Sequence, residues 1–538
     1  MPNPFPNRLI EDSKAFTATR KCMDDDLFRK IVIKTDSVDS LVKTLGENTE
    51  KYELPAYFPE LVAMEGHVFK IENRLIRVDS HSPRQIINPG LMVFSNTWQH
   101  LAGLLNQEGH EHPPKKGNEQ IMVWPDPMDG SPLLRPVTNQ DLLALKMTLE
   151  NIRPEKAADL AGTHIAAING ILLRALEAGI LLGPKPGITR SNPGEIPGAS
   201  TGDASVPAAF KTTRVFALQW HITQACDLHC RHCYDRMPCE PLTLSQEIAI
   251  LDSLYDFCST HNLFGQVSFT GGNPLLHPNF HCLYQEASDR GFFIGVLGNP
   301  ATQDEIASLI AIQQPSFYQV SLEGLEAHND HIRGSGHFQR VLAFLEILRQ
   351  TGIYSKIMLT LTRDNLDQVI PLGHFLQSRT DLFTFNRLSP MGEGANLIMA
   401  DPDRYKTFLK TYMEAVKPHT AFDLKENLFN ILLHKNNAPL FGGCTGYGCG
   451  AAFNFVSVLA TGQVHACRKF PSPIGDITRQ SLTRIYHSDI AARYRKGPDA
   501  CRSCRINPVC RGCMAAAHSW GLDVFTQKDP YCFFKNGS

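Results

Sequence analysis

A regular alternation of strand-like and helix-like segments between Arg214 and Leu388 constrains the fold of this chain more than any other feature. The predicted strands are Arg214–Thr223, Gln266–Thr270, Phe292–Leu297, Phe317–Leu322, Lys356–Leu361 and Phe383–Leu388. The predicted helices between them are Thr243–His261, Asn279–Arg290, Gln303–Ile312, His337–Thr351 and Leu366–Gln377. Short apolar runs separated by longer segments of helical period indicate a parallel sheet with helical crossovers. The sequence therefore predicts an α/β domain of six β/α units, wound into an open, partial (β/α)6 parallel barrel.

Three cysteines directly follow the first predicted strand, at the end where barrel enzymes place their chemistry. Cys226, Cys230 and Cys233 form a Cys-x3-Cys-x2-Cys array on a short loop. Three thiolates at this spacing can bind three irons of a four-iron cluster and leave the fourth iron open to a substrate or cosubstrate. The alternative is a zinc or thiol redox site, in which His229 or His232 completes four closed ligands.

The cysteine content, taken with the rest of the chain, indicates whether the cysteines form disulfides or bind metal. The chain has 15 cysteines and a formal net charge of −2. Its start, MPNPFPNRLIEDSK, lacks the apolar core of a signal peptide, and no apolar run is long enough to span a bilayer. We therefore expect a soluble cytoplasmic protein without affinity for nucleic acid or membranes. In a reducing compartment, clustered cysteines indicate metal binding or catalysis rather than disulfides.

Eight further cysteines gather in the last hundred residues. They are Cys444, Cys449, Cys467, Cys501, Cys504, Cys510, Cys513 and Cys532. Eight thiolates are what two fully ligated four-iron clusters require, although paired zinc knuckles use similar Cys-x2-Cys spacings. The other cysteines, Cys22, Cys239, Cys258 and Cys282, are interpreted as ordinary thiols.

The first cysteine array, with the aromatic Tyr234 after its last cysteine, resembles that of the radical S-adenosylmethionine (SAM) superfamily. After the second strand stands Thr270-Gly-Gly-Asn-Pro274, and the matching Gly-Gly-Glu-Pro loop of the family holds the amino group of SAM. Gly271 and Gly272 retain the backbone part of this role, because glycine allows close approach to a ligand. Asn273 replaces the family's glutamate, and the backbone role survives that change, so the resemblance implies that Gly271, Gly272 and Asn273 bind SAM.

A second part of the resemblance follows the fourth predicted strand. Val320-Ser-Leu-Glu-Gly324 and His331-Ile-Arg-Gly334 resemble the Ser-Leu-Asp-Gly and Ile-Arg-Gly segments of radical SAM peptide maturases. The resemblance implies that Ser321 and Arg333 hold the SAM carboxylate, and a guanidinium suits that group physically. Gly298-Asn299, after the third strand, is expected to line the same cavity.

The C-terminal cysteines resemble the SPASM domain of peptide-modifying radical SAM enzymes. The resemblance implies an interleaved ligation, with Cys444, Cys449, Cys467 and Cys513 on the first auxiliary cluster. The second cluster is then bound by Cys501, Cys504, Cys510 and Cys532. The two residues between Cys510 and Cys513, where the family usually has three, leave this partition less certain than the total. The resemblance thus implies three 4Fe-4S clusters, one binding SAM and two auxiliary.

The resemblance also implies the reaction. A radical SAM enzyme cleaves SAM reductively to a 5′-deoxyadenosyl radical, which abstracts hydrogen from the substrate, and the cofactor supplies this chemistry. Arg468 follows Cys467 where the sulfatase-activating branch has an aspartate base, which disfavours that branch. The lead-in His221 to Gln224 and the long N-terminal region are similar to the thio(seleno)oxazole-modification maturases. The implied partners are a small ribosomal precursor peptide, modified at cysteine or selenocysteine, and a reductant such as flavodoxin or ferredoxin.

Thioether cross-linking is the nearest competing reaction. A non-catalytic iron–sulfur or zinc protein that binds a peptide is the rival from another class.

The N-terminal third gives weaker signals. The alternation in GHVFKIENRLIRVD, from Glu65 onward, predicts strands with a turn near Glu72-Asn73, and a helix is expected to begin near Thr97. Residues 155–183 predict a winged-helix-like helix, turn and helix, similar to leader-peptide-binding domains or, alternatively, a helical cap on the barrel. The predicted domains are 1–183 (α+β, leader recognition), 184–210 (linker), 211–395 (barrel), 396–443 (bridging helical region) and 444–538 (SPASM).

Overall fold

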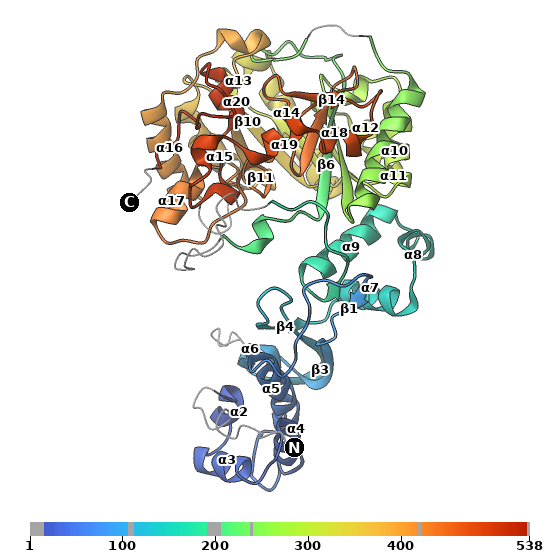
Figure 1. Ribbon diagram of the computed structural model, residues 1–538, viewed down its shortest axis with the longest axis vertical. Coiled ribbons are helices and arrows are strands. Elements are labelled where there is room, and N and C mark those ends of the chain that lie inside the picture. Colours follow the sequence, from blue (N-terminus) through green and yellow to red (C-terminus); the bar gives the residue numbers. More distant parts are fainter. Residues whose placement is uncertain (1–14, 106–111, 191–205, 237–239, 417–420, 535–538) are drawn as a thin grey trace. The chain divides into compact units, whose positions relative to one another are not determined.

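The computed structural model describes residues 15–105, 112–190, 206–236, 240–416 and 421–534. The chain divides into two compact units (Figure 1), which are described separately here. The first comprises residues 1–163 and 167–185, and the second comprises residues 164–166 and 186–538.

The first unit combines helices with two small antiparallel sheets. Its helices are α2 Thr17–Lys21, α3 Asp25–Val32, α4 Val38–Glu47, α5 Phe58–Glu72, α6 Leu101–Leu105, α7 Asn139–Glu150, α8 Pro154–Ala161 and α9 Ile165–Glu177. Its strands are β1 Ile86–Ile87, β2 Met92–Gln99, β3 Lys115–Pro125, β4 Pro132–Pro136 and β5 Leu181–Leu182. The sheet order is β2-β3-β4, and β1 pairs with β5. The winged-helix likeness of α8 and α9 stays a prediction.

Helix α5 corrects the prediction of strands from Glu65 onward. The apparent alternation arose because two polar residues of this helix point inward. The carboxylate of Glu65 accepts the backbone N–H of Ala18 at 2.8 Å and of Thr19 at 2.7 Å, in the first turn of α2. The buried His67 ring lies 2.9 Å from the carbonyl oxygen of Gly90. Buried polar groups with partners look like surface positions in a one-dimensional pattern.

The region after this helix needs a smaller correction. Strand β2 continues through the expected helix start near Thr97 to Gln99, and the helix α6 begins only at Leu101. The β-branched and aromatic residues of this segment explain the longer strand.

The second unit is built on one nine-stranded sheet. Its strands are β6 Val215–Thr223, β7 Phe264–Gly271, β8 Phe293–Leu297, β9 Phe317–Ser321, β10 Ser355–Leu361, β11 Leu382–Arg387, β12 Phe455–Val458, β13 Gln463–His465 and β14 Pro473–Asp476. The order is β11-β10-β9-β8-β7-β6-β12-β13-β14. Strands β6 to β11 are mutually parallel, as the sequence predicts. The curvature implied by a partial barrel stays a prediction.

Helices follow the parallel strands in the predicted alternation and continue into the C-terminal region. They are α10 Leu244–Thr260, α11 Phe280–Asp289, α12 Gln303–Ile312, α13 Glu326–Arg333, α14 His337–Thr351, α15 Val369–Leu376, α16 Pro402–Ala415, α17 Phe429–Lys435, α18 Leu482–Tyr486, α19 Asp489–Lys496 and α20 Met514–Ser519. Capping boxes at Thr243 and Thr302 begin α10 and α12. One continuous core of buried apolar residues fills this unit.

The cysteine-rich C-terminal region shares this sheet. Strand β12 pairs in parallel with β6, with Phe455 opposite Ala217 and Val458 opposite Trp220. The hairpin that carries Cys467 is therefore fixed beside the strand that precedes Cys226. In the described part of the chain, no helix combines the length and apolar character needed to cross a bilayer.

Candidate functional site

The loop after β6 carries the first cysteine array at the carboxyl end of the parallel strands. Cys226 is exposed, Cys233 is half-buried and Cys230 is buried. Burial is the main cause that raises the pKa of the Cys230 thiol, and the nearby Arg333 guanidinium opposes it. The backbone N–H of Cys233 donates to the carbonyl of Cys230 at 3.1 Å, which tightens the loop. The guanidinium of Arg236 donates to the same carbonyl at 3.0 Å.

The glycine turn after β7 lies directly against this loop. The backbone N–H of Gly272 donates to the carbonyl of Thr223 at 2.8 Å, and that of Asn273 donates to the carbonyl of Ala225 at 2.7 Å. Gly271 has a φ of 133°, and a Cβ added there would lie 2.1 Å from the oxygen of Thr223. A Cβ on Gly272 would lie 2.2 Å from the oxygen of Ala225. Only glycine permits this approach of the two loops.

Two buried amides hold a carboxylate inside the cysteine array. The side chain of Asn273 donates to Oδ1 of Asp227 at 3.0 Å, and that of Asn299 donates to the same oxygen at 2.6 Å. The Asn299 amide also lies 3.5 Å from Sγ of Cys226. The asparagine that replaces the family's glutamate thus faces an aspartate of the neighbouring loop. Asp227 was missed by the sequence reasoning, although it stands between the first two cysteines.

Arg333, at the end of α13, lies beside the same cysteines. Its Nη1 lies 3.7 Å from Sγ of Cys230, while Nε and Nη2 donate to Oε1 of Glu323 at 2.9 and 2.6 Å. The second carboxylate oxygen of Glu323 accepts the backbone N–H of Thr360 at 2.7 Å. Burial raises the pKa of Glu323, but His232 and Arg333 outweigh it and hold that pKa below its ordinary value. Glu323 therefore orients the guanidinium of Arg333, a role that the sequence alone did not indicate.

Ser321 is the last residue of β9 and is half-buried, opposite Met358 of β10. It lies at the same carboxyl edge of the sheet as the cysteine loop, since β6 to β9 are parallel neighbours.

The C-terminal cysteines lie near one another in the structure, and their division into two ligand sets stays a prediction. In the first set, burial is the main cause that raises the pKa of Cys444 to about 11 and of Cys467 to about 12. Negative charge on Cys449 and Cys513 adds to this effect. Cys513 likewise adds to the effect of burial in raising the pKa of Cys449. Metal binding would release the protons of these buried thiols.

The second set surrounds a cavity. Cys501, Cys504, Cys510 and Cys532 line a small cavity of about 20 Å³, together with Ile431, Ile506, Asn507, Arg511, Gly512, Asp529 and Phe534. Burial, with Cys532 and Cys504 adding to it, raises the pKa of Cys501 to about 12. Four thiols around one cavity fit an iron–sulfur cluster.

The two sets adjoin each other, since the backbone N–H of Cys449 donates to the carbonyl of Cys510 at 3.1 Å. Buried side chains hold the backbone of both. Asn427 accepts the backbone N–H of Cys444 and donates to the carbonyl of Gly512, each at 2.7 Å.

In the described part of the chain, no three His, Cys, Asp or Glu side chains are arranged to hold a single metal ion. Cys22, Cys258 and Cys282 belong to neither set, and Cys239 lies outside the described residues.

An ion pair connects the first cysteine loop to the C-terminal region. The guanidinium of Arg468 donates to Oδ2 of Asp235, whose other oxygen accepts from the side chain of Gln224 at 3.0 Å. Arg468 also lies over the ring of Tyr234, 4.8 Å from its centroid. Because Asp235 and Arg468 follow cysteines of different arrays, the pair fixes the two cysteine loops to one another.

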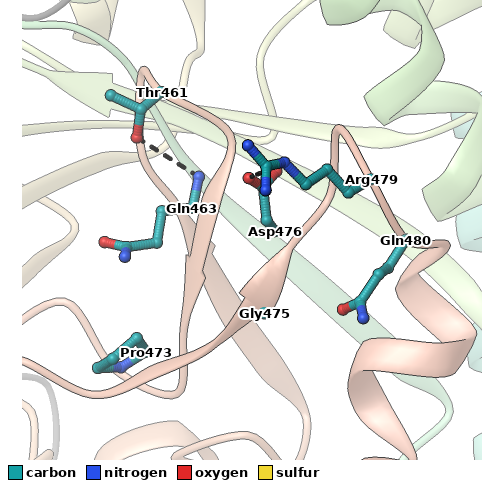
Figure 2. A pocket seen from close by; sticks show the side chains of 7 residues that line it. All are labelled: Thr461, Gln463, Pro473, Gly475, Asp476, Arg479 and Gln480. Carbon is teal, nitrogen blue, oxygen red and sulfur yellow. Dashed lines mark hydrogen bonds and ion pairs between the residues drawn. The ribbon is translucent and has the colours of Figure 1, made fainter.

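A polar groove lies on the C-terminal hairpin (Figure 2). Thr461, Gln463, Pro473, Gly475, Asp476, Arg479 and Gln480 line it. Asp476 and Arg479 are 3.6 Å apart, and both are exposed to solvent. No cysteine lines this groove, and we assign no catalytic role to it.

Comparison with known proteins agrees with this geometry. Residues 220–376 match the model of the Radical SAM superfamily, and residues 449–514 match that of SPASM, an iron-sulfur cluster-binding domain. The AdoMet-dependent heme synthase of Methanosarcina barkeri is 24% identical over 60% of this chain and 97% of its own length. The mycofactocin maturase MftC of Mycolicibacterium smegmatis is 28% identical over 59% of this chain and 82% of its own.

A solved structure supports the fold. Streptococcus suis SuiB, bound to its precursor peptide SuiA, superposes with a TM-score of 0.50 at 15% identity, covering 77% of this chain and 96% of SuiB. The matched models imply 4Fe-4S clusters and SAM binding. The glycine turn and the thiol-lined cavity are consistent with those groups. Residues 220–376 are therefore similar to the Radical SAM superfamily, and residues 449–514 are similar to the iron-sulfur cluster-binding SPASM domain.

Proposed function

We propose that this chain cleaves SAM reductively to a 5′-deoxyadenosyl radical and uses that radical to oxidise a ribosomally made peptide. The observation that carries the proposal is the loop of Cys226, Cys230 and Cys233 at the carboxyl end of β6, directly against the Gly271-Gly272 turn. When bound, a four-iron cluster on three thiolates supplies an electron and an open iron for SAM.

The side chains around this loop have separable tasks toward SAM. Gly271 and Gly272 give the amino group access to the backbone, because neither carries a Cβ. Arg333, with Ser321, binds the carboxylate. Since Glu323 takes Nε and Nη2 of Arg333, the Nη1 group beside Cys230 is the one directed toward SAM. A half-buried, pre-oriented guanidinium binds a carboxylate without the entropic cost of ordering a long side chain.

The two C-terminal thiol sets are assigned two auxiliary 4Fe-4S clusters, which brings the total to three. Cys444, Cys449, Cys467 and Cys513 hold the first, and Cys501, Cys504, Cys510 and Cys532 hold the second. Support comes from the mutual electrostatic influence within each set and from the cavity that the second set lines.

A small precursor peptide is the proposed substrate. Two relatives support this class: one is named a maturase, and the other was solved with a precursor peptide. Residues 1–183 are proposed to bind the leader, and the edge strands β2 and β4 offer main-chain groups for strand addition. A cytoplasmic location and a flavodoxin- or ferredoxin-type reductant complete the proposal.

At the reacting residue we propose oxidation of cysteine or selenocysteine, of the thio(seleno)oxazole type, with thioether formation as the second candidate. Arg468 supports the exclusion of sulfatase-type activation, because its guanidinium is paired with Asp235 and cannot serve as a carboxylate base.

Two cysteine variants of the anaerobically reconstituted chain test the enzyme. With SAM and dithionite, Cys230→Ala is expected to release no 5′-deoxyadenosine, because the cluster that binds SAM is lost. Cys504→Ala is expected to retain at least part of this release and to lose the peptide product. Equal behaviour of the two variants, with the remaining clusters intact, would contradict the division of tasks.

The rival function is a non-catalytic iron–sulfur or zinc scaffold that binds a peptide. A fully metal-loaded wild-type chain that binds peptide but releases no 5′-deoxyadenosine would support it. Removal of residues 1–183 tests leader recognition separately. We expect weaker peptide binding with continued SAM cleavage, which also reports that the remaining unit is folded. Unchanged peptide affinity would contradict the leader-binding role.

A further inference from the structure

Two buried arginines and one half-buried arginine gather beside the C-terminal thiol sets. Arg190 is 6% exposed and Arg511 is 4% exposed. Two guanidinium nitrogens of Arg190 donate to the carbonyls of Tyr447 and Cys449, and its group lies 4.1 Å from the centroid of the Phe453 ring. These contacts place one positive charge directly over the backbone of a proposed cluster ligand.

Arg511 and Arg495 complete the group. Arg511 stands between Cys510 and Gly512 and donates to the carbonyl of Arg495. Arg495 donates to the carbonyls of Ala452 and Tyr486, at 3.2 and 2.6 Å. All three arginines therefore bond to neutral carbonyl oxygens, and none of the carboxylates in the described residues forms an ion pair with them.

The backbone at Arg511 adds an independent observation. Its φ is 59°, in the left-handed region that favours glycine. A non-glycine residue costs about 1–2 kcal/mol there. A turn that needed only this conformation would be more stable with glycine, so the arginine side chain is present here at a cost in backbone strain.

A buried charge without a counter-ion is energetically costly. The contacts of these arginines indicate where their counter-ion would lie. Nε of Arg190 and Nε of Arg511 are buried and lack a hydrogen-bond partner within the described residues. Arg190 contacts the backbone of Cys449, and Arg511 lines the cavity of the second cysteine set. The negative charge that these two guanidinium groups lack is therefore expected on the cysteine side.

We propose that Arg190 and Arg511 are fixed counter-charges of the two auxiliary clusters and raise their reduction potentials. Arg190 serves the cluster of the Cys449 set, whose backbone it contacts, and Arg511 serves the cluster of the set whose cavity it lines. An iron–sulfur cluster on four thiolates is anionic, and each added electron makes it more so. Buried positive charge beside it favours the reduced form, in a region where charges are weakly screened. The auxiliary clusters are thereby suited to accept an electron rather than to supply one. The inference rests on the proposed function and extends it.

The test measures potentials in the full chain and does not depend on turnover. Cys226, Cys230 and Cys233 are first changed to Ala, so that only the C-terminal clusters remain. Redox titration followed by electron paramagnetic resonance then compares Arg190→Gln and Arg511→Gly with this parent. Arg511→Gly removes the charge and relieves the backbone strain together, so its loss of charge is not confounded with misfolding.

We expect each variant to lower the equilibrium constant for reduction of one cluster at least tenfold, which is about 59 mV for one electron. Arg190→Lys and Arg511→Lys should restore most of the potential, because they restore the charge. Arg479→Gln is the matched control, since this arginine belongs to the same domain and its side chain is 83% exposed. It should leave both potentials unchanged.

Three results would overturn the inference. The first is a potential in Arg190→Gln and Arg511→Gly that equals the parent's with unchanged iron and sulfide content. The second is loss of the cluster in the Lys variants as well as the neutral ones, which would assign the arginines to local folding. The third is an unchanged potential together with phosphate or chloride bound at the arginines. If neutral variants lose one cluster and the Lys variants keep it, the counter-charge role is supported. Failure of the parent to bind any cluster would instead reject the proposed function.

Discussion

A buried ionic triad anchors the C-terminal region to the parallel sheet, and its removal has a calculable cost. Arg387, the last residue of β11, is 5% exposed and lies between Glu426 and Asp529. It donates to Glu426 at 3.0 and 3.2 Å and to Asp529 at 2.9 and 2.7 Å. Asp529 also accepts the backbone N–H of Cys513 at 2.8 Å, so the triad supports a proposed cluster ligand.

The decisive change is Arg387→Met, which keeps most of the side-chain volume and leaves two buried carboxylates facing each other. Breaking a buried ion pair by removing one partner costs about 3–5 kcal/mol, and here two partners are left uncompensated. We expect a loss of at least about 4 kcal/mol in the stability of the second unit. Neutralising the carboxylates as well, in Arg387→Met/Glu426→Gln/Asp529→Asn, should recover much of this loss, because no buried charge remains.

The assay is urea unfolding of the reconstituted chain, followed by the visible absorbance of its iron–sulfur clusters and, separately, by far-ultraviolet circular dichroism. Arg404→Met is the matched control. Arg404 forms a 2.9 Å pair with Asp367, but the two side chains are 51% and 83% exposed. Its loss should cost no more than about 1 kcal/mol. An Arg387→Met chain as stable as Arg404→Met would refute the reasoning that the triad is an anchor.

Three further predictions concern the cysteine loop and its surroundings. Gly272→Ala should weaken SAM binding at least tenfold by equilibrium dialysis, because its Cβ would lie 2.2 Å from a backbone oxygen of the cysteine loop; Gly103→Ala, with no atom within 4 Å, is the control. Asp235→Asn should lower the free energy of unfolding by about 2 kcal/mol. A double-mutant cycle with Arg468→Gln should show coupling between the two residues, and additive effects would mean that the ion pair does not contribute to stability. His337 is buried, and burial with the nearby Arg333 charge lowers its pKa to about 3. The unfolded chain binds a proton near pH 6.5 that the folded chain does not, so stability should fall as the pH drops below 6.5, by up to about 1.4 kcal/mol per pH unit. His337→Gln should remove this one-proton slope in urea unfolding between pH 7 and 5, and an unchanged slope would show that other groups cause it.

Local sequence patterns were enough to predict those features that depend on residues close together in the chain. The strands β6 to β11 were predicted because short apolar segments and helical periods alternate, and a parallel sheet has few ways to arrange them. The spacing of Cys226, Cys230 and Cys233 is a covalent property of the chain, and so is the Gly-Gly pair that follows the next strand. In the N-terminal unit the same reasoning failed, because Glu65 and His67 are polar residues that point inward to backbone partners.

The sequence by itself thus determined the parallel α/β domain, the cysteine inventory and the radical SAM and SPASM resemblance. Only the tertiary structure decided which charges meet. It brought Asp227 to Asn273 and Asn299, joined Asp235 to Arg468 across 233 residues, and buried Arg190 against Cys449. The physical reason is that hydrophobic periodicity is repeated along each element and can be read locally, whereas an ion pair or a buried counter-charge depends on single contacts between distant segments, which no local pattern encodes.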